Sequence, residues 1–146
     1  MIETKELSYF SRMTDAPTFQ RLALVETQQH GLNRAGAVGA VTDGSDWCQG
    51  FVDFHRPDAV RILDFPHAAE HVASIGQAAL GEDTAGAQGW LTQQLHALKH
   101  DGSESVLAAA RQFAATPPDQ LELAQTLAYL AKRQPQLPYP AFQAPA

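Results

Sequence analysis

Two short apolar segments, each running into an aspartate, flank a helical segment in the first half of the chain. Residues 35–42 (Ala-Gly-Ala-Val-Gly-Ala-Val-Thr) are small and apolar without helical periodicity, which predicts a buried strand that stops at the Asp43-Gly44 turn. Residues 60–65 (Val-Arg-Ile-Leu-Asp-Phe) predict a second strand, and residues 45–55 predict a short helix between the two. Two strands that are joined through a helix lie parallel in the sheet, with a right-handed crossover. This pattern therefore constrains the region to an α/β arrangement.

Further helices are predicted on either side of this strand pair. The tripeptide at residues 15–17 (Asp-Ala-Pro) is typical of a helix start, because the carboxylate accepts hydrogen bonds from free amide groups and proline suits the first turn. Helical spacing continues until Gly31, which is typical of a helix end. Another helix is expected from about residue 67 to residue 80. Residues 16–80 thus predict the order helix, strand, helix, strand, helix.

The second half of the chain has a different pattern, dominated by amphipathic helices. Turn-forming residues separate these helices, and a tail with four prolines follows, which we expect to be extended. The predicted helices cover residues 84–100, 104–115 and 120–133. The predicted organisation is an α/β region at residues 1–80, an all-α region at 81–134 and a proline-rich extended tail at 135–146.

Composition narrows the class of protein. The chain has 146 residues, of which 45% are hydrophobic and 18% charged, so it can bury the core of an ordinary domain. A formal charge of −6 argues against a basic protein that wraps nucleic acid. The single cysteine, Cys48, excludes an internal disulfide and a cysteine-rich zinc finger. No apolar stretch is long enough for a membrane span, and the polar N-terminus does not resemble a signal peptide, so we expect a cytoplasmic protein.

Asp43 is the first candidate functional residue. It follows a predicted parallel strand, and ligands bind at the carboxyl ends of such strands in open α/β sheets. A carboxylate there is a hard oxygen ligand suited to Mg²⁺ or Mn²⁺. The structural alternative is a turn or helix-capping aspartate, which is common in Asp-Gly pairs.

Asp64 ends the next predicted strand and is the second candidate. Asp43 and Asp64 are therefore expected near each other at one sheet edge, where two carboxylates repel unless a cation or a proton lies between them. The structural alternative is that Asp64 caps the helix that follows.

The sequence His67-Ala68-Ala69-Glu70-His71 offers a different chemistry. His67 and His71 are four residues apart and share one helix face. The string matches the inverted zinc-peptidase pattern, in which two histidines bind zinc and the glutamate acts on water. A zinc-dependent hydrolase would need a third ligand, and no later acidic residue has a matching sequence context.

Residues 41–47 (Val-Thr-Asp-Gly-Ser-Asp-Trp) and residues 56–71 (Arg-Pro-Asp-Ala-Val-Arg-Ile-Leu-Asp-Phe-Pro-His-Ala-Ala-Glu-His) together carry a family resemblance. They resemble the middle of bacterial insertion-sequence transposases of the Mutator-like group, which have an RNase H-like DDE catalytic core. The similar pattern is an Asp-Gly-x-x-Trp turn, a short helix and a strand that ends Leu-Asp-Phe-x-His-Ala-x-Glu-His. The resemblance covers residues 35–80.

This resemblance implies a function. Such cores hold two divalent cations, Mg²⁺ or Mn²⁺, between three carboxylates and catalyse in-line phosphoryl transfer at the ends of transposon DNA and in target DNA. Asp43 matches the second catalytic aspartate of the family. Asp64 and His67 match a Cys/Asp-x-x-His motif beside the catalytic centre. The helices at residues 84–133 would be an all-α insertion into the core.

The differences from the family pattern also carry implications. The first catalytic aspartate and the catalytic glutamate of the family have no counterpart here, so the resemblance implies an internal fragment, inactive in transposition by itself. Strands absent from such a fragment would leave a sheet edge exposed, through which the chain would self-associate. Three hypotheses follow: a DDE transposase fragment, a zinc-dependent hydrolase that uses His67, Glu70 and His71, and a non-catalytic α/β interaction module.

Overall fold

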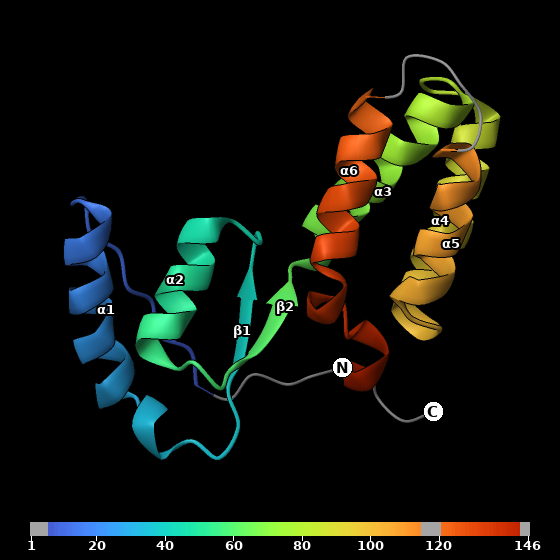
Figure 1. Ribbon diagram of the computed structural model, residues 1–146. Helices are drawn as coiled ribbons and strands as arrows, with labels where there is room; N and C mark the ends of the chain where they lie inside the picture. The colour runs from blue at the N-terminus through green and yellow to red at the C-terminus, as the bar shows by residue number, and fades with distance from the viewer. Residues whose placement is uncertain (1–5, 115–120, 144–146) are drawn as a thin grey trace. The chain divides into compact units, whose positions relative to one another are not determined.

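The computed structural model describes residues 6–114 and 121–143, and shows a mainly helical chain with one two-stranded sheet (Figure 1). The chain divides into two compact units: the first extends to Arg61, and the second begins at Ile62. Among the described residues, no helix is both long and apolar enough to cross a membrane. The elements are α1 (Ala16–Gln29), η1 (Leu32–Arg34), β1 (Gly39–Thr42), α2 (Asp46–His55), β2 (Val60–Leu63), α3 (Phe65–Leu80), α4 (Ala85–His100), α5 (Ser103–Ala114), α6 (Leu121–Lys132), η2 (Gln134–Gln136) and η3 (Tyr139–Phe142), where η denotes a 3₁₀ turn.

The two strands pair in parallel, as the helix between them requires (Figure 1). The backbone N–H of Val60 donates to the carbonyl of Val38 at 2.8 Å and so fixes the register. Both strands are shorter than predicted. The predicted strand at residues 35–42 is present, but its length and burial were predicted wrongly: β1 covers only four residues, and Val41 is 61% exposed. A strand is buried only where other elements cover both faces of its sheet, and the exposure of Val41 shows that one face here is not covered.

Local capping explains the helices of the first unit. The Asp15 side chain accepts a hydrogen bond from the Thr18 amide at the start of α1, and the Ser45 hydroxyl accepts from the Cys48 amide at the start of α2. α1 and α2 then pack through aromatic rings. The Phe19 ring centre lies 6.1 Å from that of Phe51, and Phe51 lies 5.5 Å from Trp47. These half-buried and exposed rings form the apolar contact between the two helices.

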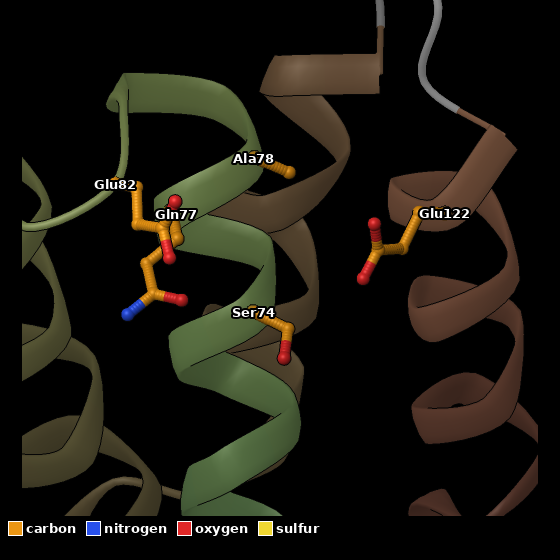
Figure 2. A pocket seen from close by; sticks show the side chains of 5 residues that line it. All are labelled: Ser74, Gln77, Ala78, Glu82 and Glu122. Carbon is orange, nitrogen blue, oxygen red and sulfur yellow. The ribbon is translucent and has the colours of Figure 1, made fainter.

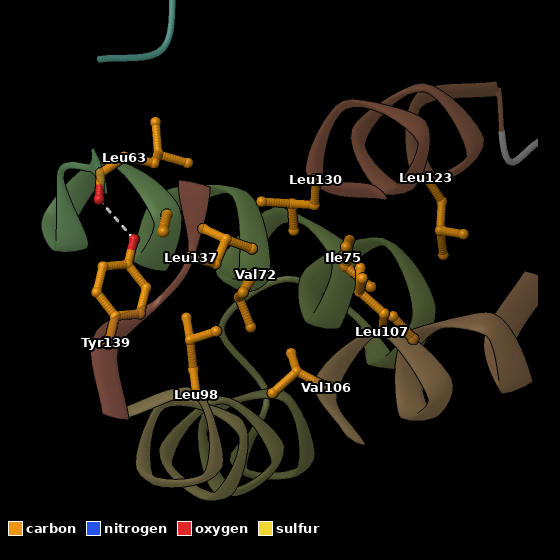
Figure 3. Close-up of a cluster of buried hydrophobic side chains, with 12 residues drawn as sticks. Leu63, Val72, Ile75, Leu98, Val106, Leu107, Leu123, Leu130, Leu137 and Tyr139 are labelled. Carbon is orange, nitrogen blue, oxygen red and sulfur yellow. Dashed lines mark hydrogen bonds between the residues drawn. The ribbon is translucent and has the colours of Figure 1, made fainter. Parts of the chain in front are cut away.

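The core of the molecule lies in the second unit, where α3, α4, α5 and α6 pack as a bundle (Figure 1). One continuous cluster of buried apolar side chains joins them (Figure 3). The amphipathic helix predicted at residues 84–100 is confirmed as α4: Leu98 is buried in this cluster, and Trp90 packs against it. The largest fully buried side chains are Leu63, Val72, Ile75, Leu98, Leu107 and Leu123.

The C-terminal segment is not the extended tail that its prolines predicted. Residues 134–143 form the turns η2 and η3, and Leu137 and Tyr139 are buried. The Tyr139 hydroxyl donates to the carbonyl oxygen of Leu63 at 2.6 Å (Figure 3). The packing of these two side chains outweighs the local preference of proline for extended backbone. The turn-forming residues between the helices predicted at 104–115 and 120–133 lie outside the described residues.

Gly76 lies at a close contact between α3 and α4. A Cβ atom added at this position would lie 2.8 Å from Cε3 of Trp90, which is closer than packed atoms tolerate. We therefore expect Gly76→Ala to lower the free energy of unfolding by about 1–3 kcal/mol through overpacking. The matched control is Gly89→Ala on α4, because nothing lies within 4 Å of its added Cβ. That change should raise stability by up to about 1 kcal/mol through helix propensity. Urea unfolding of both variants measures the contrast, and equal effects at the two sites would contradict it.

Candidate functional site

Asp43 lies in an exposed turn directly after β1. Its Oδ1 accepts a hydrogen bond from the Ser45 amide at 2.9 Å, and the Gly44 amide donates to the Thr42 hydroxyl at 3.2 Å. Gly44 has a φ of 78°, in the left-handed region that glycine adopts readily. The turn thus fixes the Asp43 side chain at the carboxyl end of the strand, and its local bonds match the structural alternative as well.

The Cys48 thiol is a neighbour of this turn. Burial raises the pKa of Cys48; the Ser45 hydroxyl lowers it, and the Asp43 carboxylate raises it further. The thiol is therefore mainly protonated at neutral pH, whereas a reactive cysteine needs a lowered pKa. Cys48 thus has no sign of a nucleophilic role.

Asp64 occupies the N-cap position of α3, and its carbonyl accepts from the Ala68 amide at 3.0 Å. Its carboxylate makes no capping hydrogen bond to the first turn. The structural alternative, a side-chain cap, is therefore not what the geometry shows. Instead, the carboxylate acts on the buried Tyr139: burial raises the pKa of the Tyr139 hydroxyl well above its usual value, and the charge of Asp64 raises it further.

His67 and His71 lie in the first turns of α3, with ring centres 5.2 Å apart. Nδ1 of His67 is 3.7 Å from Oε2 of Glu70. The His71 ring packs on the Tyr129 ring of α6 at 4.2 Å, and the guanidinium of Arg133 lies over the same tyrosine ring at 3.9 Å. The two histidines therefore sit at a junction of α3 and α6 that is built from aromatic and cationic groups.

Burial and the charges at this junction change the pKa of His71. Burial lowers the pKa of His71, and the positive charges of His67 and Arg133 lower it further, against an opposing effect of Glu70. A cationic neighbour also disfavours a bound dication. Across residues 6–114 and 121–143, no group of three or more His, Cys, Asp or Glu side chains is arranged to hold a metal ion.

The lowered pKa of His71 predicts an acid-sensitive stability. His71 binds a proton less readily in the folded chain than in the unfolded chain, so its contribution is present above about pH 6.5, the ordinary histidine value, and is lost as the pH falls below it. Stability should therefore decrease as the pH falls below that value. Unfolding curves between pH 8 and pH 5 measure it. His71→Gln should flatten the dependence, and an unchanged slope in that variant would rule out this assignment.

The predicted site residues divide between the two units. Asp43 belongs to the first unit, and Asp64 and His67 belong to the second. Within the second unit, Asp64 and His67 are placed at the start of α3 as predicted. The convergence of Asp43 with these two residues at one sheet edge stays a prediction.

A polar pocket of about 250 Å³ lies elsewhere in the second unit (Figure 2). Glu122 of α6 faces α3 across it, and Glu82 lies just beyond the end of α3. Both carboxylates are exposed, so solvent screens them. The remaining lining residues are Ser74, Gln77 and Ala78. None of these residues was predicted as a site, and none has a partner there that suggests catalysis.

Comparison with known proteins adds no assignment: no family model, curated protein or solved structure matches the chain.

Proposed function

We propose that the chain supplies part of the catalytic core of a DDE transposase with an RNase H-like fold. The observation that carries this proposal is the strand pair: two parallel strands, joined through a helix, each followed directly by an aspartate. Those aspartates are Asp43 and Asp64, and His67 follows three residues after Asp64. The same residues stand at the matching places of the transposase pattern described above.

Asp43 is the metal-holding residue in this proposal. Its carboxylate is exposed and fixed by the Ser45 amide, which suits a hard cation such as Mg²⁺ or Mn²⁺. When bound, such a cation neutralises charge on a DNA phosphate and favours ionisation of the attacking hydroxyl. The reaction forms one phosphorus–oxygen bond and breaks another, and the leaving 3′ oxygen takes up a proton. By the family resemblance, Asp64 and His67 match the motif that borders such a centre.

The 146-residue chain supplies one of the three carboxylates that the family uses. One carboxylate does not organise two cations in the geometry that phosphoryl transfer needs. We therefore expect no DNA cleavage by this chain alone. The DNA partner, the transposon ends and the target, belongs to the intact family member.

Binding of Mn²⁺ tests the assignment of Asp43 with the chain as it stands. Paramagnetic Mn²⁺ broadens NMR signals of nearby amides even when binding is weak. We expect the strongest broadening at Gly44 and Ser45, and its loss in Asp43→Asn. Asp46→Asn is the matched control, because it removes the same charge from an exposed aspartate three residues away. Broadening that survives Asp43→Asn, or that depends equally on Asp46, would remove Asp43 as the ligand.

The zinc-dependent hydrolase remains an alternative hypothesis with its own signature. His67 and His71 are close enough to share an ion, but Arg133 adds positive charge beside them. This alternative requires one Zn²⁺ per chain in isothermal titration, with binding lost in His71→Gln. Absence of stoichiometric zinc would leave the transposase proposal as the better account.

Self-association is the partner proposal that the sheet supports. Val41 and Val60 fall on the same face of the strand pair, given that Val60 is opposite Gly39 in the register, and they are 61% and 47% exposed. Parallel sheets normally have both faces covered. We expect the mass measured by light scattering to rise with concentration, and to rise less in Val41→Lys. A constant monomeric mass would contradict association through this sheet.

A further inference from the structure

Two histidines lie side by side at the C-terminal end of α4. His96 and His100 are four residues apart on this helix, and their ring centres are 4.6 Å apart with an interplanar angle of 41°. Both residues are exposed, and neither ring makes a hydrogen bond or an ion pair with another residue that the structure describes. Both rings are therefore available to a ligand from solution.

The helix holds this pair in place. Leu98, between the two histidines, is 1% exposed and belongs to the buried cluster, so this part of α4 is anchored on the bundle. The amides of Asp101 and Gly102 both donate to the carbonyl of Ala97, at 2.7 and 2.9 Å, and close the helix end. A ligand that needs both rings thus meets a pre-organised pair.

The separation of the rings fits one shared metal ion. Imidazole nitrogens bind Zn²⁺ at about 2.0–2.1 Å, so two rings on one ion have centres about 4.4–5.1 Å apart at square-planar or tetrahedral angles. The 4.6 Å separation lies inside this range. The pair also lies at the negative end of the helix dipole, in a chain with a formal charge of −6. Lys99 is the opposing charge, and its exposed ammonium group stays in water.

We propose that His96 and His100 together bind one divalent late transition metal ion, and that Cu²⁺ binds most tightly. Imidazole suits Cu²⁺, Ni²⁺ and Zn²⁺, and Cu²⁺ stands highest in the order of affinities at a given site. Water completes the coordination, and the bound ion links successive turns at the end of α4. This site lies in the second unit and does not involve Asp43, whose carboxylate suits harder cations.

The other histidine pair with this spacing, His67 and His71, is a poorer site. Its ring centres are 5.2 Å apart, but His71 is partly buried and its ring packs on Tyr129. The guanidinium of Arg133 lies over the same tyrosine ring and repels a cation. We therefore expect the α4 pair to bind first.

Paramagnetic Cu²⁺ tests the site in the full chain by NMR. At low ratios of Cu²⁺ to chain, broadening should be strongest at the amides of residues 96–101. The affinity for Cu²⁺ at these amides should fall by about 10²-fold in His96→Gln, and equally in His100→Gln, because each variant loses the advantage of a second ligand already in place. His30→Gln is the matched control, since His30 is an exposed histidine whose partner is Glu26, and it should leave this affinity unchanged.

Unfolding in urea with Zn²⁺ is a second measurement. An ion that binds the folded pair should raise the midpoint of the wild-type chain, but not that of His96→Gln. The rise should survive His71→Gln, which separates this site from the zinc-dependent hydrolase. The proposal is overturned if Cu²⁺ broadening is strongest on α3 or spread evenly over all of the histidines, if either single variant keeps the wild-type affinity, or if His30→Gln weakens binding as much. Broadening of Gly44 by Mn²⁺ should be the same in His96→Gln, so the Asp43 proposal stands or fails separately.

Discussion

Replacing Tyr139 with alanine should lower the free energy of unfolding of the second unit by about 3–5 kcal/mol, the usual cost of removing a buried aromatic side chain. Tyr139 is 7% exposed, and its ring lies 5.0 Å from that of Phe65, nearly perpendicular to it. Its hydroxyl provides the hydrogen bond to the Leu63 carbonyl. A loss below about 1 kcal/mol in urea unfolding would show that the C-terminal turns do not contribute to the fold.

Tyr139→Phe isolates the hydroxyl group. This variant keeps the ring but leaves the carbonyl of Leu63 without this donor, which should cost about 1–3 kcal/mol. The raised pKa of Tyr139 adds a dependence on pH. The unfolded chain releases this proton near pH 10, before the folded chain does, so stability is present below that pH and is lost as the pH rises above it. Tyr139→Phe also changes stability at neutral pH. After correction for that change, this variant should unfold at a higher alkaline pH than the wild-type chain.

Leu107→Ala should destabilise the second unit by about 2–5 kcal/mol, because it leaves a cavity where α5 meets the bundle. Leu107 is 1% exposed and belongs to the continuous cluster in Figure 3. Leu121→Ala is the matched control, since Leu121 starts α6 in the same unit and is 72% exposed. It should change stability by less than about 0.5 kcal/mol. Similar losses in the two variants would contradict the assignment of Leu107 to the core.

The sequence predicted best where the signal is local. Asp15 caps α1 as predicted, and the short helix predicted at residues 45–55 begins after Ser45, because a side-chain oxygen and a free amide three residues away need no distant partner. The amphipathic helix at residues 84–100 was likewise predictable, since helical periodicity indicates that one face of α4 meets the core. The parallel pairing of β1 and β2 followed from the helix between them.

Strand length and the C-terminal segment depend on distant packing, which local signals do not encode. The small apolar residues 35–42 predicted a longer, buried strand, but only Gly39–Thr42 form β1. Four prolines indicated an extended tail, yet Tyr139 is buried and reaches the carbonyl of Leu63. That contact joins residues 76 positions apart, so no sequence window contains both partners.

In the candidate site, too, local features were predictable and distant contacts were not. The positions of Asp43 and Asp64 were predictable, because each ends a recognisable apolar strand. The surroundings of His71 were not, because Tyr129 and Arg133 come from α6 and its end, far away in the sequence. The spacing of four residues between Tyr129 and Arg133 was the only available sign that these two side chains lie on one side of α6 and its end.

Cleavage of DNA by the chain joined to the reading frames on both sides of its own tests the transposase proposal most directly. We expect the upstream frame to supply an aspartate at a strand end and the downstream frame to supply a glutamate. The joined protein should cleave transposon-end DNA only with Mg²⁺ or Mn²⁺. Asp43→Asn should slow cleavage by about 10²-fold or more, the scale on which loss of a charge-stabilising group acts, while Asp46→Asn should leave the rate unchanged. An adjoining frame without these carboxylates, or cleavage that is indifferent to Asp43→Asn, would contradict the proposal.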